Sequence, residues 1–170
     1  METIQKNKYK VSNSNLNKSY DFDKINNKRF LTDKATEYFI KNILVNENEN
    51  PIVTDLIKTI YRFKELQYNW DTYGAEKISV ESISIAIQIV KIFESSNLLV
   101  NYAFPMRNGG VQLEMNFENY NLELEINENN KINLLVFNKD NDFKFECDYD
   151  IIDLANLINK LKEYYGHLQH

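Results

Sequence analysis

Cysteine, histidine, proline and glycine are all scarce in this chain of 170 residues. A single cysteine, Cys147, excludes an intramolecular disulfide framework and zinc sites of the CxxC type. Both histidines, His167 and His170, lie in the last four residues, which argues against His-rich metal sites and most Ser-His-Asp triads. The chain also lacks a Gly-rich phosphate-binding loop and a nucleophile motif. We therefore expect no cofactor, no bound metal and no catalytic residue.

Long apolar segments are missing as well. No apolar run approaches the eighteen residues of a membrane-spanning helix, and the N-terminus lacks the apolar stretch of a secretory signal. We therefore expect no membrane association and a cytoplasmic location.

Charge is unevenly distributed along the chain. Residues 1–34 carry eight Lys or Arg and four Asp or Glu, a net charge of +4, whereas residues 35–170 carry twelve against twenty-one, a net charge of −9. The basic leader is either a solvated disordered tail or an arm for an anionic partner or for the acidic body itself. Because contact with phosphates dominates nucleic-acid affinity, the acidic body argues against direct nucleic-acid binding by the folded part.

The first half of the chain has helical periodicity. Residues 1–20 lack sustained periodicity, and residues 21–31 carry scattered apolar side chains that could lie along the body. A first helix is expected after Thr32 or Asp33. Asn50 and Pro51 are typical of a helix start, which predicts a second helix from 51 to about 67. A third helix should follow Ser79 and reach about Glu94. It is apolar around much of its circumference, which predicts a central, buried helix.

From about residue 98 the apolar period changes from 3.6 to 2, which predicts five antiparallel strands in a meander. An edge strand around Val100–Met106 precedes the strongest hairpin signal, Asn108-Gly109-Gly110. A turn at Asn119-Tyr120 would then pair Met115 with Leu124, Leu113 with Ile126, Glu114 with Glu125 and Asn116 with Glu123. Later turns would pair Ile126 with Ile132, Leu124 with Leu134 and Leu134 with Phe145. This register places the apolar sets on one face, with Cys147 among the buried residues.

A final helix should follow Asp150, with Leu154, Leu157, Ile158 and Leu161 as its packing stripe. The fold class is therefore α+β in two layers, with helices, a five-stranded antiparallel meander and a C-terminal helix. We expect a single domain over residues 32–166, a mostly disordered leader over 1–31 and a frayed tail over 167–170.

Two segments together resemble a family of small uncharacterised prokaryotic proteins. The family has an N-W-D-x-Y-G-A loop before a helix, and a G-G-[IV]-Q-L-E-[WM] strand followed by an L-x-[IL]-E-I strand. The similar segments here are Asn69–Ala75, Gly109–Met115 and Leu122–Ile126, within about residues 55–160; Met115 stands where the family more often has Trp. The resemblance implies no activity. It implies an accessory role in mobile or defence-type gene neighbourhoods.

The loop Trp70-Asp71-Thr72-Tyr73-Gly74 has two interpretations. In the first it is structural, with Trp70 as a corner anchor, Asp71 as an acceptor for backbone N–H groups and Gly74 at positive φ. In the second it is a recognition loop, in which Trp70, Asp71 and Tyr73 contact a partner.

The polar face of the sheet has three interpretations. Gln112, Glu114, Glu123 and Glu125 gather there, with Glu146 and Asp148 farther off. The face is a hydrated surface, a binding surface for a basic partner, or a carboxylate site for a divalent metal or for acid–base chemistry.

The chemistry-bearing motifs that are missing favour a non-catalytic protein-interaction module, an accessory, antitoxin-like or immunity-like subunit of a bacterial or phage conflict system. Its predicted partner-binding residues are Trp70, Asp71, Tyr73, Gln112, Glu114, Glu123 and Glu125, and its predicted partner is a basic protein. A homodimer is the alternative assembly. The alternative function is a small metal-assisted hydrolase that uses the clustered glutamates.

Overall fold

The structure is a computed structural model, and it describes residues 50–117, 120–127, 129, 131–139 and 144–150, together with 156, 157, 159 and 161. The basic leader, the helix expected after Thr32 or Asp33, and the C-terminal tail with both histidines lie outside these residues. So does most of the helix expected after Asp150. Two residues of its expected stripe, Leu157 and Leu161, are described, and both are buried in the core.

Helix α2 spans Pro51–Arg62 and continues as the 3₁₀ helix η2, Phe63–Glu65. The Oδ1 atom of Asn50 accepts the N–H of Ile52 at 3.0 Å, so Asn50 caps the helix as predicted. Residues at helical spacing bury one face of α2: Val53, Ile57 and Ile60.

Helix α3 spans Val80–Ser95, close to its predicted bounds. Ser79 is the N-cap, and its Oγ accepts the N–H of Ser82 at 2.9 Å. Because α3 is apolar around most of its circumference, it is buried along nearly its whole length and forms the centre of the core.

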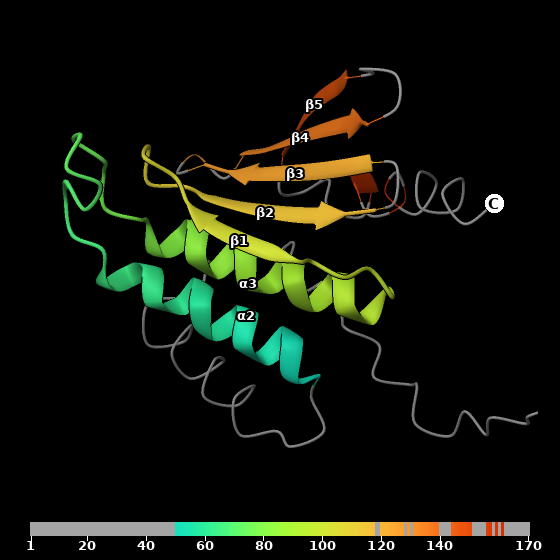
Figure 1. Cartoon of the computed structure of the whole chain (residues 1–170), viewed down its shortest axis with the longest axis horizontal. Helices are drawn as coiled ribbons and strands as arrows, with labels where there is room; N and C mark the ends of the chain where they lie inside the picture. Colours follow the sequence, from blue (N-terminus) through green and yellow to red (C-terminus); the bar gives the residue numbers. More distant parts are fainter. Residues whose placement is uncertain are drawn as a thin grey trace, which may run out of the picture.

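The sheet has five strands in the order β1-β2-β3-β4-β5, and each neighbouring pair is antiparallel. This is the predicted meander and the predicted α+β class. The strands are β1 Tyr102–Pro105, β2 Val111–Asn116, β3 Tyr120–Ile126, β4 Lys131–Asn138 and β5 Lys144–Asp150. Figure 1 shows the sheet above α3, with α2 next to α3 and below β1.

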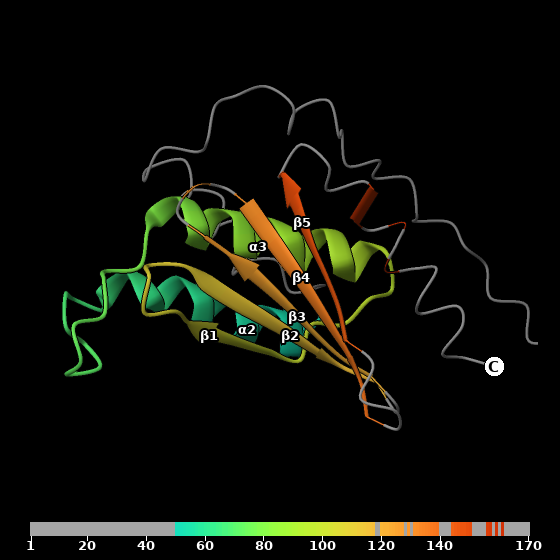
Figure 2. The same ribbon diagram turned by 90° about the horizontal axis from the view of Figure 1, so that it is seen from above.

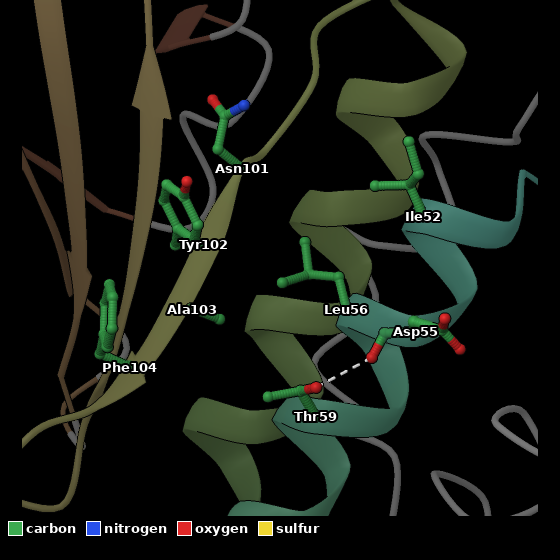
Figure 3. A pocket seen from close by; sticks show the side chains of 8 residues that line it. All are labelled: Ile52, Asp55, Leu56, Thr59, Asn101, Tyr102, Ala103 and Phe104. Carbon is green, nitrogen blue, oxygen red and sulfur yellow. Dashed lines mark hydrogen bonds between the residues drawn. The ribbon is translucent and has the colours of Figure 1, made fainter.

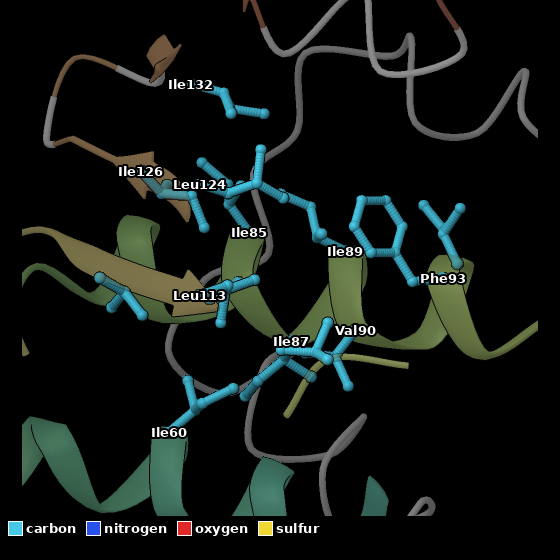
Figure 4. Close-up of a cluster of buried hydrophobic side chains, with 14 of the residues drawn as sticks. Ile60, Ile85, Ile87, Ile89, Val90, Phe93, Leu113, Leu124, Ile126 and Ile132 are labelled. Atoms are coloured by element: carbon cyan, nitrogen blue, oxygen red, sulfur yellow. The ribbon is translucent and has the colours of Figure 1, made fainter. Parts of the chain in front are cut away.

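The described helices lie on one face of the sheet, as the two views together show (Figures 1 and 2). Alternate side chains of β2, β3 and β4 are buried in one core cluster with those of α3. Figure 4 shows Ile85 of α3 close to Leu113 and Leu124, with Ile89 and Phe93 farther along the helix. Burial of these apolar side chains is the main source of the domain's stability. The opposite face of the sheet carries the polar residues of β2 and β3, with Leu135 and Phe137 of β4 beside them.

The predicted strand register is correct for one pair and wrong for two. Ile126 pairs with Ile132, as expected. Between β2 and β3, however, Met115 pairs with Leu122 and not with Leu124. Between β4 and β5, Leu134 pairs with Cys147 and not with Phe145. Each error is two residues, which preserves the buried face, so alternation alone cannot detect it.

The β2–β3 error comes from the turn. Phe117 donates its N–H to the carbonyl of Tyr120 at 2.8 Å, so the turn closes one residue earlier than Asn119-Tyr120 would place it. Moving a hairpin turn by one residue moves every cross-strand pair by two. The consequence for the polar face is that Glu114 lies opposite Glu123, and Gln112 lies opposite Glu125.

Side chains of the edge strand β1 alternate between the two faces of the sheet. Ala103 pairs with buried Leu113, so Ala103 lies on the core face, while Tyr102 and Phe104 lie on the same face as Glu114 and Gln112. They are 52% and 45% exposed, with ring centroids 6.3 Å apart. Cys147, expected to be buried, pairs with buried Leu134 but is only partly buried itself.

Candidate partner-binding site

Hydrogen bonds within the loop hold the segment 69–75, which we call the 69–75 loop, in a closed shape. Asn69 donates its N–H to the carbonyl of Ala75 at 2.7 Å, and its Oδ1 accepts the N–H of Gly74, also at 2.7 Å. Asn69, Thr72 and Gly74 all have positive φ, at 64°, 66° and 85°. Glycine adopts this conformation without penalty, and asparagine adopts it more readily than most residues. Asn69 and Gly74 therefore suit the backbone path of the loop, whereas the β-branched Thr72 adopts a backbone conformation that is unfavourable for its residue type.

Asp71 holds the centre of the 69–75 loop. Its Oδ1 accepts the N–H groups of Tyr73 at 2.8 Å and Ala75 at 3.0 Å. Its Oδ2 lies 2.7 Å from Nε of Arg107, and Arg107 also donates to the carbonyl of Tyr73. Partial desolvation acts to raise the pKa of Asp71, but the two backbone N–H groups and the Arg107 guanidinium outweigh it. The pKa of Asp71 therefore lies below its usual range.

These contacts predict an acid-sensitive loop. Because the folded-state pKa of Asp71 is lowered, its charged form stabilises the fold above the unfolded pKa of about 3.9, and this contribution is lost as pH falls through the folded pKa. Asp71→Asn should therefore have a lower free energy of unfolding than the wild type at pH 7, and the gap should narrow in acid. Urea unfolding of the wild type and the variant at pH 7 and at acidic pH measures this difference in free energy. Asp55→Asn, at an exposed carboxylate, is the control, and an equal pH dependence in both variants would contradict the prediction.

The two motifs of the sequence contact each other, although more than thirty residues separate them. Glu76 donates its N–H to the carbonyl of Arg107 at 2.8 Å, and Ser79 donates to the carbonyl of Gly109 at 2.9 Å. The Asp71–Arg107 ion pair adds a side-chain link. The loop and the Asn108-Gly109-Gly110 turn are therefore one structural unit at the N-terminus of α3. Sequence reasoning missed Arg107, since its position next to the hairpin turn gives no sign of a contact with Asp71.

The predicted loop residues separate into two roles. Trp70 is half-buried against the core, and its Nε1 donates to the carbonyl of Glu76 at 3.0 Å. Asp71 is only 15% exposed and its oxygens are already paired. Both are placed as the structural interpretation expects. Tyr73 is 79% exposed, with the Arg107 guanidinium carbon 6.0 Å from its ring centroid. Of the three predicted loop residues, Tyr73 is therefore the one that is exposed to solvent.

The second group of candidates lies on the open face of the sheet. Glu114 and Glu123 face each other across β2 and β3, and Gln112 and Glu125 form the next pair. Gln112 donates its Nε2–H to Oε1 of Glu114 at 2.9 Å. Two carboxylates of β5 extend the surface, since Asn133 of β4 donates to Glu146 and to Asp148 at 2.9 and 3.2 Å. We call these residues the acidic sheet face: Gln112, Glu114, Glu123, Glu125, Glu146 and Asp148.

Glu123 lies at the centre of the acidic sheet face. Partial burial raises its pKa, and the negative charges of Glu114 and Glu125 raise it further. The local field therefore disfavours another negative charge and favours a positive one. In the described part of the chain, no three histidine, cysteine or acidic side chains form a group that could hold a metal ion.

The structure brings the two candidate surfaces to one hairpin without merging them. Arg107, in the β1–β2 turn, contacts the 69–75 loop, while Gln112 and Glu114 of β2 belong to the acidic sheet face. Figure 1 shows the loop extending beyond the end of the sheet at which this turn lies. The β1–β2 hairpin thus contacts the loop that carries Tyr73 and also carries part of the acidic sheet face.

Comparisons with protein-family models, with curated proteins and with solved structures found no match for this chain. Among the described residues, no helix combines the length and the apolar composition that crossing a membrane requires.

Proposed function

We propose that this protein is a non-catalytic interaction module that binds a basic partner protein in the cytoplasm. The acidic sheet face would be the main contact, with Tyr73 as an aromatic anchor beside it. The observation that carries the proposal is the direct opposition of Glu114 and Glu123, with Glu125 close enough to raise the pKa of Glu123. Like charges opposite each other destabilise a sheet, so a cationic partner would relieve a cost that the free protein carries.

The same electrostatics oppose two other partners. Nucleic acid presents phosphates, which the carboxylates of the acidic sheet face would repel. A homodimer formed through this face would place glutamates against glutamates. The role as an accessory, antitoxin-like or immunity-like subunit of a bacterial or phage conflict system is supported by the resemblance of the two motifs alone.

The proposal predicts opposite effects on stability and on binding. The double substitution Glu114→Gln and Glu123→Gln removes the opposed charges, so the free energy of unfolding at pH 7 should stay equal or rise, by up to about 1 kcal/mol. Because the pKa of Glu123 is raised in the folded state, this penalty applies above the folded pKa and disappears as pH falls through it. Urea unfolding at pH 7 and at acidic pH would measure both. A less stable variant at pH 7 would contradict the prediction.

Binding is tested with a charge-matched control. One variant carries Gln at Glu114, Glu123 and Glu125; the control carries Gln at Glu65, Glu76 and Glu81, which are exposed and lie outside the sheet. Both variants lose three negative charges. A basic partner purified with the wild-type chain should associate more slowly with the first variant than with the control in stopped flow at low salt. Raising salt should shrink the difference. Equal rates for the two variants would overturn the acidic sheet face as the binding site.

A further inference from the structure

A groove separates the edge strand β1 from helix α2. Tyr102 and Phe104, which line it, also lie at the border of the acidic sheet face. The groove has a volume of about 270 Å³. Figure 3 shows Tyr102 and Phe104 along one side, Leu56 and Ile52 on the helix opposite, and Ala103 directed towards the helix. We call this the α2–β1 groove, and its lining residues are Ile52, Asp55, Leu56, Thr59, Asn101, Tyr102, Ala103 and Phe104.

The size and the exposed side chains of the groove indicate the kind of occupant. Its volume is below the range of about 300–1,000 Å³ that is typical of small-molecule pockets, and it fits one or two side chains. Ile52 is 60% exposed on one rim, and Tyr102 and Phe104 are exposed on the other. An apolar side chain of a partner would therefore remove exposed apolar surface from water on both rims.

The backbone of β1 adds a directional requirement. Met106 donates its N–H to the carbonyl of Gly110 at 2.9 Å, so its hydrogen bond points towards β2. Because bonded and outward-directed residues alternate along an antiparallel edge strand, Ala103 directs its N–H and C=O away from β2. Pro105 has no N–H, which keeps the available edge short. An extended chain can pair with Ala103, whereas a helix has already used its own backbone groups.

The charge around the groove is negative on balance. Asp55 is the charged residue among those that line it, and its exposed carboxylate forms an ion pair with Lys58 at 3.0 Å, which is a weak contact at such a site. Glu114 lies opposite Tyr102 on the adjoining sheet face and has no lysine or arginine opposite it. A segment with a basic residue complements this surface. A second copy of the chain paired along β1 would instead bring its Glu114 and Asp55 close to the same residues of the first copy. Negative charges would then face negative charges.

We propose that the α2–β1 groove binds an extended segment of a partner protein, with aliphatic residues at alternate positions and a basic residue next to them. The segment pairs with Ala103 as a short additional strand, inserts one aliphatic side chain between Leu56 and Ala103, and places its cation near Asp55. The groove adjoins the acidic sheet face through Tyr102 and Phe104, but none of the six residues of that face lines it. Either proposal can therefore fail without the other.

A phage-displayed library of random linear peptides, selected on the full chain, tests this. We expect enriched peptides with alternating aliphatic residues and a net positive charge. A synthetic copy should change the amide ¹⁵N chemical shifts of Ala103, Leu56 and Thr59. N-methylation of the peptide residue that pairs with Ala103 should weaken binding by about tenfold or more. This test leaves the protein itself unchanged.

Variants of the chain complete the test. Ala103→Pro removes the outward N–H and Thr59→Trp fills the groove, so each should weaken binding by about tenfold or more. Tyr68→Ser, at an exposed tyrosine outside the groove, should bind like the wild type. The proposal is overturned if no peptide is enriched, or if the enriched peptides bind Thr59→Trp as well as they bind the wild type. It is also overturned if the free chain self-associates and Ala103→Pro abolishes that association, because a second copy would then be the occupant.

Discussion

Gly110→Ala should lower the free energy of unfolding by about 3 kcal/mol, the upper part of the range for forcing an extra group into a packed site. A Cβ at this position would lie 2.5 Å from the carbonyl oxygen of Ile126, which is backbone at the end of β3 and cannot rotate away. The paired strands β2 and β3 would have to separate there, next to the buried residue Val111. For a domain of this size the melting temperature should fall by about 6–12 °C.

Gly74→Ala is the matched control for Gly110→Ala. A Cβ at Gly74 meets nothing within 4 Å, but the φ of 85° is unfavourable for alanine. The cost should be about 1–2 kcal/mol, and Gly74→Asn should recover part of it because asparagine tolerates this conformation. Differential scanning calorimetry of the three variants measures the order. If Gly110→Ala melted at or above Gly74→Ala, the close approach between β2 and β3 would be wrong.

Trp70→Ala should also destabilise the fold strongly, by about 3 kcal/mol, the low end of the range for truncating a core tryptophan. The ring is half-buried against the core, so part of its surface is already in water, and its Nε1 hydrogen bond to Glu76 is lost as well. Trp70→Phe keeps most of the packing and should cost about 1 kcal/mol for the hydrogen bond.

Urea unfolding followed by circular dichroism measures both Trp70 variants, because Trp70 is the single tryptophan and its fluorescence disappears with it. Unchanged stability of Trp70→Ala together with lost partner binding would identify Trp70 as an interface residue. Tyr73→Ala provides the comparison, since its exposed ring should contribute little to stability.

The sequence determined the elements of this protein that depend on local chemistry and periodicity. Asn50 and Ser79 cap α2 and α3 because their side-chain oxygens reach free N–H groups within three residues. Alternation in β2, β3 and β4 identified their buried faces, since one face must leave water. The meander order followed from short turns between successive strands.

Only the tertiary structure decided which residues oppose each other. A shift of two residues keeps the same face buried, so the periodic pattern has no information about it, and the turn at Phe117 and Tyr120 set the Glu114–Glu123 pair. The sequence also could not show that Tyr102 and Phe104 face outward. An edge strand beside a helix buries less on its core side, so its larger apolar residues need not lie there. The Asp71–Arg107 ion pair joins segments that are distant in the sequence, and packing of the loop against the β1–β2 turn brings them together.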